Sequence, residues 1–214
     1  MTELFVSNFN LFSSCNEKVK HSDIPFSQVV SCITSDRHVE ELTASARIFL
    51  ASNNRTASDV LKRRDMPAIL PNAYFESGRC MTDPHDFRTG HMMFDWDHVP
   101  RTDVDALVRN LSAHPAVSLV CRSLSGCGVH ALVRVNGASD ASFRTSYSRM
   151  SDVMELMAGG LPPDPQCNSA ARLMVLAHDA SAFVRQSAHP VELGAIQAFQ
   201  NQVSAIDQPD SIRR

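Results

Sequence analysis

The sequence has no long apolar run, no paired cysteines and little net charge. No segment approaches the roughly 18 consecutive apolar residues that a membrane-spanning helix needs. The opening residues, MTELFVSNFN, lack the basic and apolar regions of a signal peptide. A net charge of -3 argues against binding nucleic acid through total positive charge, although it is compatible with a local basic groove. These absences predict a cytoplasmic protein without a membrane partner.

The six cysteines are scattered and include no C-x-x-C pair. Free thiols in a reducing compartment are the simplest interpretation of this spacing. A zinc site formed by Cys80, His85 and His91 is an alternative, but a fourth ligand and the paired spacing of zinc sites are missing. Free thiols are therefore the favoured interpretation.

The composition is that of a folded chain, with 43% hydrophobic and 20% charged residues among 214. A chain of this length favours one domain. We expect an N-terminal subregion over 1–60, a core over 61–185, and a C-terminal helix and tail over 186–214. Apolar spacing predicts helices at 35–53, 56–65, 101–115, 139–158 and 190–206, with Ser35 and Thr102 as N-caps and with only short strands and loops over 1–34.

Between these helices lie four apolar segments that we predict to be strands. The first begins at Met92, and the four strands cover 92–97, 116–123, 128–135 and 171–179. The resulting order β-α-β-β-α-β is typical of the split βαβ, RRM/ferredoxin-like arrangement, in which two helices cover one face of the sheet and the other face is free. The sequence thus predicts an α+β fold with an N-terminal α/β extension.

The first of these strands, HMMFDWDHVP, carries two carboxylates, Asp95 and Asp97. Side-chain alternation places both on the face away from the helices. Two carboxylates so close together repel each other unless a cation neutralises them, and they can converge on divalent metal ions. The alternative is that one or both lie at the exposed end of the strand, before Pro100.

The hairpin SLSGCGVHALVRV follows the same alternation, which puts His130 on the face of the two aspartates. Gly126 and Gly128 let the backbone approach a ligand closely, and Ser123 and Ser125 offer hydroxyl donors. This combination indicates a cradle for a triphosphate. A glycine hairpin with an ordinary strand histidine is the alternative.

A third segment, PPDPQCNSAARLMVLAHD, places Asp164 and Arg172 near the start of the last predicted strand. A third carboxylate can complete a two-metal site, and an arginine can pair with phosphate oxygens. The alternative for Asp164 is a turn aspartate, since Pro163 and Pro165 flank it.

The segments FDWD, SLSGCGVH and PPD resemble, in order and spacing, the three motifs of the archaeo-eukaryotic primase superfamily, the primase-polymerase catalytic core. The wider pattern from RRDMP through FDWDH and SLSGCG to DPQCNSAARL is most similar to the branch containing VirE N-terminal domains of bacterial mobile elements. The resemblance covers about residues 60–180. It implies a DNA primase/polymerase-type nucleotidyltransferase that makes or extends primers from dNTPs or NTPs on a template.

The resemblance also implies roles for individual residues. Asp95, Asp97 and Asp164 would hold Mg²⁺ or Mn²⁺ in a two-metal site, with His130 on the phosphates of the incoming nucleotide. This chain has Pro163 where the family has an apolar, strand-like residue before its last aspartate, so Asp179 is a rival for that position. The remaining nucleotide-binding residues implied are Ser123, Ser125, Gly126, Gly128 and Arg172.

The basic cluster Lys62, Arg63 and Arg64 could meet template or primer phosphates, or could be a solvated helix end. The partners implied are nucleoside triphosphates, single-stranded DNA as template or primer, and a helicase or other replication protein acting in trans, in a bacterial, phage or plasmid context. Two other functions stay open: an inactive primase-like module that binds nucleic acid or nucleotide in a replication or defence complex, and a metal-dependent nuclease that uses the same carboxylates.

Overall fold

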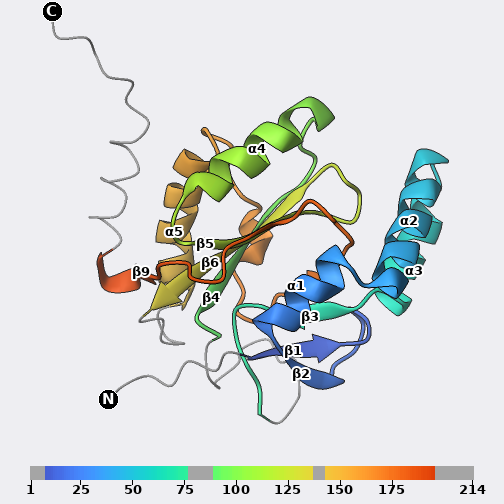
Figure 1. The fold of residues 1–214 in the computed structure, drawn as a ribbon, viewed down its shortest axis with the longest axis horizontal. Helices are drawn as coiled ribbons and strands as arrows, with labels where there is room; N and C mark the ends of the chain where they lie inside the picture. Colours follow the sequence, from blue (N-terminus) through green and yellow to red (C-terminus); the bar gives the residue numbers. More distant parts are fainter. Residues whose placement is uncertain (1–7, 77–88, 137–142, 196–214) are drawn as a thin grey trace, which may run out of the picture.

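The computed structural model describes residues 8–76, 89–136 and 143–195 (Figure 1). The fold is α+β, as the sequence predicts. The described residues form two sheets and five α-helices, and all strand pairs are antiparallel except one short parallel pair. No helix in these ranges is both long enough and apolar enough to cross a bilayer.

The core sheet has the strand order β4-β6-β5-β8, and β9 pairs in parallel with the end of β6. Its order β4-α4-β5-β6-α5 follows the prediction, and Phe94 of β4 stacks on Tyr147 of α5 with ring centroids 4.9 Å apart. The helices α4 and α5 lie on the same face of the sheet (Figure 1). The bounds are β4 His91–Trp96, α4 Arg101–Ala113, β5 Val117–Arg122, β6 Val129–Asn136, α5 Phe143–Met157, β8 Phe183–Val184 and β9 Val191–Glu192.

The second sheet has the order β2-β1-β3-β7, and its last strand corrects the prediction for 171–179. Only Met174–Val175 of that segment is a strand, and it pairs with β3 rather than with β4. Near the end of β4, the Asp164 amide donates to the Asp95 carbonyl over 2.7 Å, so the chain entering this segment already bonds to β4. The bounds are β1 Asn8–Phe12, β2 Ser22–Pro25, β3 Ala68–Leu70 and β7 Met174–Val175.

The face of the core sheet that we expected to be free is covered along most of β4. All six residues of β4 are buried. At the start of β4, the centroid of the His91 ring lies 5.2 Å from the ring centroid of Phe9 and 5.5 Å from that of Phe26. Farther along, the Met93 amide donates to Oδ1 of Asn72 over 2.7 Å. The N-terminal layer, made of the second sheet and helix α1, buries this face because both layers have an apolar side to remove from water. The end of β4 near Asp95 opens on a cleft.

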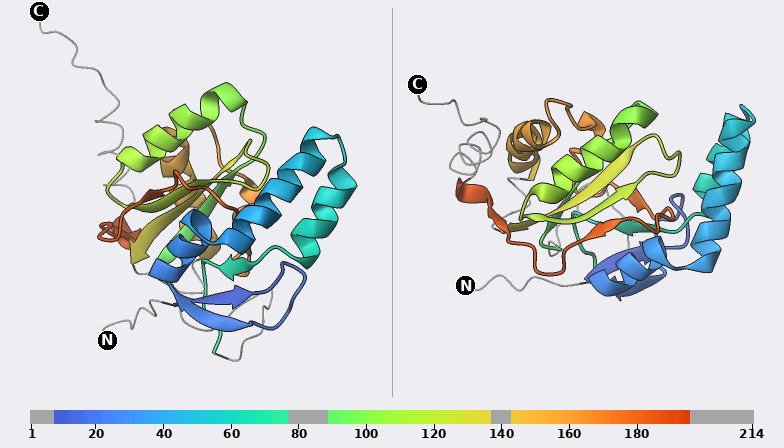
Figure 2. Two further views of the ribbon diagram at one scale, coloured as in Figure 1. Left: turned by 45° about the vertical axis from the view of Figure 1, so that its right-hand side comes forward. Right: turned by 45° about the horizontal axis from the view of Figure 1, so that its top comes forward.

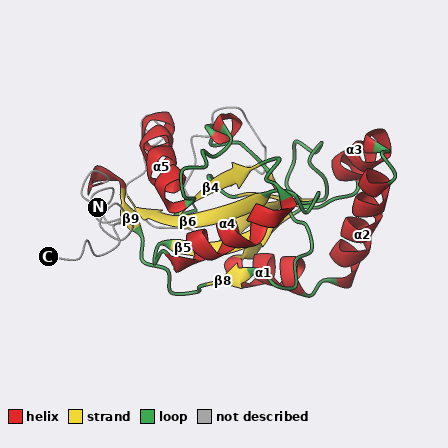
Figure 3. Ribbon diagram, turned by 90° about the horizontal axis from the view of Figure 1, so that it is seen from above, coloured by secondary structure: helices red, strands yellow, loops and turns green. Residues whose placement is uncertain are grey.

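Three helices belong to the N-terminal part. Helix α1, Phe26–Thr34, was not predicted, because 1–34 was expected to hold only strands and loops; Val29 and Ile33 are its buried residues. Helices α2, Arg37–Ala51, and α3, Arg55–Arg64, form an antiparallel hairpin beside the two sheets (Figure 2). The hairpin lies at the end of the molecule opposite α5 and β9 (Figure 3).

Both predicted N-caps are wrong by one or two residues. Helix α2 is capped by Asp36, whose carboxylate accepts from the Val39 amide over 3.0 Å, rather than by Ser35. Helix α4 begins at Arg101 after a proline, and the Thr102 hydroxyl donates to Asp103 instead of capping it. A carboxylate accepts a backbone N–H more strongly than a neutral hydroxyl does, which favours the aspartate as cap.

The C-terminal helix predicted over 190–206 begins differently. Val191–Glu192 is a strand, because Val135 at the end of β6 pairs with Val191, and Leu193–Ala195 is a single 3₁₀ turn. The rest of that prediction, and the tail, lie outside the described residues. The same holds for 139–142 at the start of the predicted helix 139–158.

Candidate active site at the end of β4

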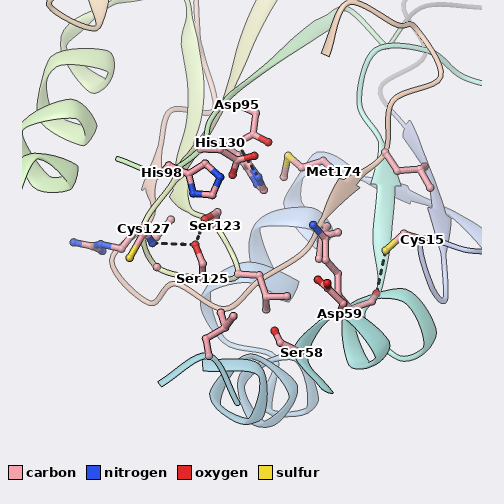
Figure 4. Close-up of a pocket in the computed structure, with 18 of the residues that line it drawn as sticks. Cys15, Ser58, Asp59, Asp95, His98, Ser123, Ser125, Cys127, His130 and Met174 are labelled. Carbon is pink, nitrogen blue, oxygen red and sulfur yellow. Dashed lines mark hydrogen bonds and ion pairs between the residues drawn. The ribbon is translucent and has the colours of Figure 1, made fainter. Parts of the chain in front are cut away.

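A cleft of about 1490 Å³ opens between the end of β4, the loop joining β5 to β6, and the α2–α3 hairpin. Segment 166–175 supplies a further part of its wall. We call it the central cleft. Figure 4 shows Asp95 and His130 together in it, with Ser123 and Ser125 on the adjoining loop. Its walls therefore come from both sheets and from the N-terminal helices.

Asp95 and His130 stand opposite each other on the paired strands β4 and β6. Their atoms Oδ1 and Nε2 are 3.4 Å apart, and both side chains are about nine-tenths buried. Oδ1 of Asp95 and Nδ1 of His130 have no hydrogen-bond partner. The contact is therefore an ion pair without an aligned hydrogen bond, and the Cys121 thiol lies close enough to His130 to contribute to its pKa.

The two groups shift each other's pKa. Burial alone would lower the pKa of His130, but the Asp95 carboxylate outweighs it and raises the pKa to about 10. Burial alone would raise the pKa of Asp95, but His130 and, at longer range, Arg172 and Lys62 hold it below its usual value. The pair is therefore an imidazolium and a carboxylate near neutral pH.

Asp164 lies beside Asp95. Its amide donates to the Asp95 carbonyl, and its carboxylate accepts from the Gln166 amide over 2.9 Å at the start of a 3₁₀ turn, Pro165–Cys167. Atoms of Asp95, Asp164 and Cys167 that could bind a metal lie within 4.8 Å of one another. The structure thus brings together two of the three carboxylates predicted to hold metal.

The oxygen atoms of this cluster fit a hard divalent cation. Carboxylates are the ligands that Mg²⁺ prefers, and within the described part of the chain the buried Oδ1 of Asp95 has only His130 as an oppositely charged contact. Cys167 fits less well, because burial and the nearby Asp95 raise the pKa of its thiol to about 12. A neutral thiol is a poor ligand for Mg²⁺. Asp95 and Asp164 therefore suit Mg²⁺ or Mn²⁺.

Asp97 is less closely placed than predicted. It follows the last residue of β4, is exposed, and lines the central cleft without joining the cluster of Asp95 and Asp164. The strand ends at Trp96, so strand alternation no longer determines its direction. The next residue, His98, has a φ of 58° and also lines the cleft. Sequence reasoning missed His98; a histidine directly after D-x-D was the only available signal.

The loop 123–128 is tightly built. Gly126 has a φ of 73°, which favours glycine, and a Cβ on Gly128 would come within 2.6 Å of the Trp96 carbonyl oxygen. The hydroxyls of Ser123 and Ser125 are 3.2 Å apart, and Oγ of Ser125 accepts from the Cys127 amide. The predicted glycines are thus required by the backbone and by the close packing of the loop on β4.

Several basic residues line the cleft. Its wall includes Arg172, Lys62 and Arg63, three of the residues for which phosphate contacts were predicted. Arg64 is not part of the wall: among the described residues that line the cleft it is absent, and its guanidinium pairs with Asp65 at 3.1 Å. Arg47 of α2 also lines the cleft and was not predicted, because only the tertiary structure brings α2 to the loop.

The rival aspartate, Asp179, is occupied elsewhere. Its Oδ2 accepts from the Arg122 amide, and its Oδ1 accepts from the Arg122 guanidinium and from Ser181. These bonds outweigh burial and hold the pKa of Asp179 below its usual value. Asp164, not Asp179, is the carboxylate that the structure places beside Asp95.

The zinc alternative is not supported at His91, the one member of the trio that the structure describes. It lies among aromatic rings, and burial lowers its pKa to about 3. Cys80 and His85 lie outside the described residues. The five described cysteines, Cys15, Cys32, Cys121, Cys127 and Cys167, are free.

Comparisons with known proteins give one family and one solved structure. No curated protein matches the chain. The polymerase domain of Mycobacterium tuberculosis Ligase D, solved in complex with DNA, is 11% identical with a TM-score of 0.33; the match covers 72% of this chain and only 63% of that one. Residues 61–183, more than half of the chain, match the family model for the BT4734-like N-terminal domain, a family associated with primase-like proteins. The chain belongs to the BT4734-like N-terminal domain family.

Proposed function

We propose that this chain is a metal-dependent nucleotidyltransferase of the primase-polymerase kind, which adds dNTPs or NTPs to a primer on a single-stranded DNA template. The observation that carries the proposal is the cluster of Asp95, His130 and Asp164 in the central cleft, next to the loop 123–128. Residues 1–60 and 61–185 act as one catalytic unit, because both contribute to the walls of the cleft.

Asp95 and Asp164 would hold Mg²⁺ or Mn²⁺, with Asp97, which lines the same cleft, as a further carboxylate ligand. When bound, the cations lower the pKa of the primer 3′-hydroxyl and neutralise charge on the triphosphate. The contribution of the protein is to hold these carboxylates in place before the substrate arrives. The bond between the Asp164 amide and the Asp95 carbonyl supports this role, because it ties the two backbones together.

His130 contacts the phosphates of the incoming nucleotide. Its positive charge is maintained by the facing Asp95 carboxylate. Ser123, Ser125 and the glycine-containing backbone lie alongside it. Arg172, which also lines the cleft, pairs with phosphate oxygens. Because the site holds fixed charges, binding and orientation account for most of the expected catalysis.

Lys62 and Arg63 contact the phosphates of the template or primer, since their helix ends at the wall of the cleft. Arg64 is left out of this role, because it pairs with Asp65. A helicase or other replication protein supplies unwound template in trans.

The test is incubation with single-stranded DNA, labelled dNTPs or NTPs, and Mg²⁺ or Mn²⁺, with products resolved by length. The wild type should make or extend primers, and Asp95→Asn should not. Asp152→Asn, on the exposed side of α5, is the matched control and should behave as the wild type.

Other products would point to other functions. Shortening of labelled DNA without added nucleotide, lost in Asp95→Asn, would identify a nuclease. Nucleotide binding by calorimetry without any synthesis would identify a binding module. Synthesis that persists in the double variant Asp95→Ala, Asp97→Ala would sink the assignment of the site.

A further inference from the structure

Arg47 connects helix α2 to the loop 123–128. Its guanidinium donates to the carbonyl of Leu124 over 3.1 Å, of Ser123 over 3.3 Å and of His178 over 3.4 Å. Burial lowers the pKa of Arg47, but an arginine stays charged in a protein. It makes no ion pair with any carboxylate in the described residues, so its principal partners are these three carbonyls.

Two of these carbonyls belong to peptide groups whose N–H is free. In a trans peptide the C=O and the N–H point in opposite directions, and the described residues contain no cis peptide. By holding the carbonyls of Ser123 and Leu124, Arg47 turns the amides of Leu124 and Ser125 away from itself. Neither of these N–H groups donates to another group among the described residues.

The other amides of the loop are already used. The Ser123 amide donates to the Gly128 carbonyl, the Gly126 amide to the Ser123 carbonyl, and the Cys127 amide to Oγ of Ser125. These bonds close the loop on itself. The amides of Leu124 and Ser125 are thus the adjacent pair of this loop that donate to no other group of the described residues, with Leu124 buried and Ser125 exposed.

The loop is also held in place by packing against helix α2 and strand β7. The side chain of Leu124 is buried in a small second core with Ala46 of α2 and Val175 of β7. A Cβ added to Gly126 would meet the Arg47 guanidinium at 3.7 Å, so the loop lies directly against that side chain. An amide pair mounted on such a loop is oriented before any ligand binds, which lowers the entropy cost of binding.

We propose that Arg47 is the positioning residue of loop 123–128: by holding the carbonyls of Ser123 and Leu124, it orients the amides of Leu124 and Ser125 toward the triphosphate that the proposed function assigns to this loop. Successive N–H groups in a turn form an anion-binding hollow of this kind. The proposal rests on the proposed function, because it assigns a subsite for the substrate of that reaction. It also extends the site beyond the family match over 61–183, to helix α2.

The test compares Arg47→Met and Arg47→Lys with the wild type. Arg37→Met is the control, since Arg37 lies on the same helix, is exposed and pairs only with Glu41. Calorimetry measures binding of inorganic triphosphate and of dATP and ATP. Removing one oriented contact to a charged phosphate should weaken triphosphate binding about tenfold in Arg47→Met. Arg47→Lys keeps the charge but cannot hold three carbonyls at once, so it should also bind more weakly than the wild type.

In steady-state synthesis the same variants should raise KM for the nucleotide about tenfold while kcat stays nearly unchanged, a split that general loss of structure would not produce. Thermal unfolding sets an assay temperature at which every variant is folded. If Arg47→Met does not fold, Arg47→Lys decides the question alone.

The proposal would be overturned if both variants bound triphosphate as tightly as the wild type. It would also be overturned if Arg47→Lys kept full affinity while Arg47→Met lost it, because the positive charge alone would then be enough. The proposed function fails separately. Triphosphate binding that depends on Arg47, without any primer synthesis, would support the subsite and contradict the polymerase. Synthesis with no Arg47 dependence would do the reverse, and absence of triphosphate binding in the wild type would overturn both.

Discussion

Two sets of buried polar groups in this protein differ in how completely they are satisfied. In the central cleft, Asp95 and His130 face each other, yet each keeps a buried atom without a hydrogen-bond partner. Away from the cleft, both carboxylate oxygens of Asp179 accept hydrogen bonds, and Nδ1 of His91 donates a hydrogen bond to the Thr89 carbonyl. Unsatisfied buried atoms are uncommon in native proteins. Nε of Arg134 and the Tyr147 hydroxyl are unpartnered as well, so the missing bonds alone do not mark the site. What distinguishes Asp95 and His130 is that two opposite charges face each other, nearly buried, in the wall of the central cleft.

The largest expected effect separates Asp164 from Asp179. Asp164→Asn should lower primer synthesis about a thousandfold or more, because it removes a cation ligand from the proposed site. The free energy of unfolding should change little. Activity assays and denaturant unfolding on the same preparation check both parts.

Asp179→Asn should show the opposite behaviour. The substitution breaks the pair with Arg122 and should cost about 2 kcal/mol of stability. Synthesis should persist at temperatures where the variant is folded. If Asp179→Asn were inactive but as stable as the wild type, Asp179 rather than Asp164 would have to be the cation ligand.

The next effect concerns the charge on His130. Asp95→Asn removes the carboxylate that raises the pKa of His130 to about 10, and burial then lowers this pKa below 6.5. Titration of the imidazole by NMR measures the change. In the wild type, the raised pKa of His130 adds stability that is complete below pH 6.5 and is lost as the pH rises through about 10. A His130 that titrates near 6.5 in the wild type would remove the distinction between the two histidines.

A smaller effect is expected at the other buried histidine. His91 has a pKa of about 3 in the folded state and 6.5 when unfolded, so the unfolded state binds the proton first as the pH falls. Stability should decrease below pH 6.5 by about 1.4 kcal/mol per pH unit from this group. His91→Gln should remove that part of the slope. His189→Gln, on the exposed surface, should leave it intact.

The smallest effect compares two basic residues of α3. Lys62→Ala should reduce the salt dependence of single-stranded DNA binding by about one unit of slope, as expected for the loss of one phosphate contact. Arg64→Ala should leave the slope unchanged, because Arg64 already pairs with Asp65 away from the cleft. If both variants changed the salt dependence equally, the basic cluster would be better explained as a solvated helix end than as a specific contact with DNA. Fluorescence anisotropy at several salt concentrations measures both.

Local periodicity in the sequence was enough to predict much of the core and part of the site. The alternation of apolar and polar residues located β4, β5 and β6, and it put Asp95 and His130 on one face, where the structure pairs them. Helical spacing located α2, α3 and α4 to within a few residues. These features depend on which way neighbouring side chains point, and that is determined within a few residues.

The tertiary structure decided what depends on distant partners. The segment after Asp164 pairs with β3 instead of β4, the N-terminal layer covers a face expected to be free, and Arg47 reaches a loop more than seventy residues away. It also decided between Asp164 and Asp179 as the neighbour of Asp95, since the sequence pattern favoured Asp164 but left Asp179 as a rival. Strand pairing and long-range hydrogen bonds join groups that no local pattern connects, so only the folded chain brings them together.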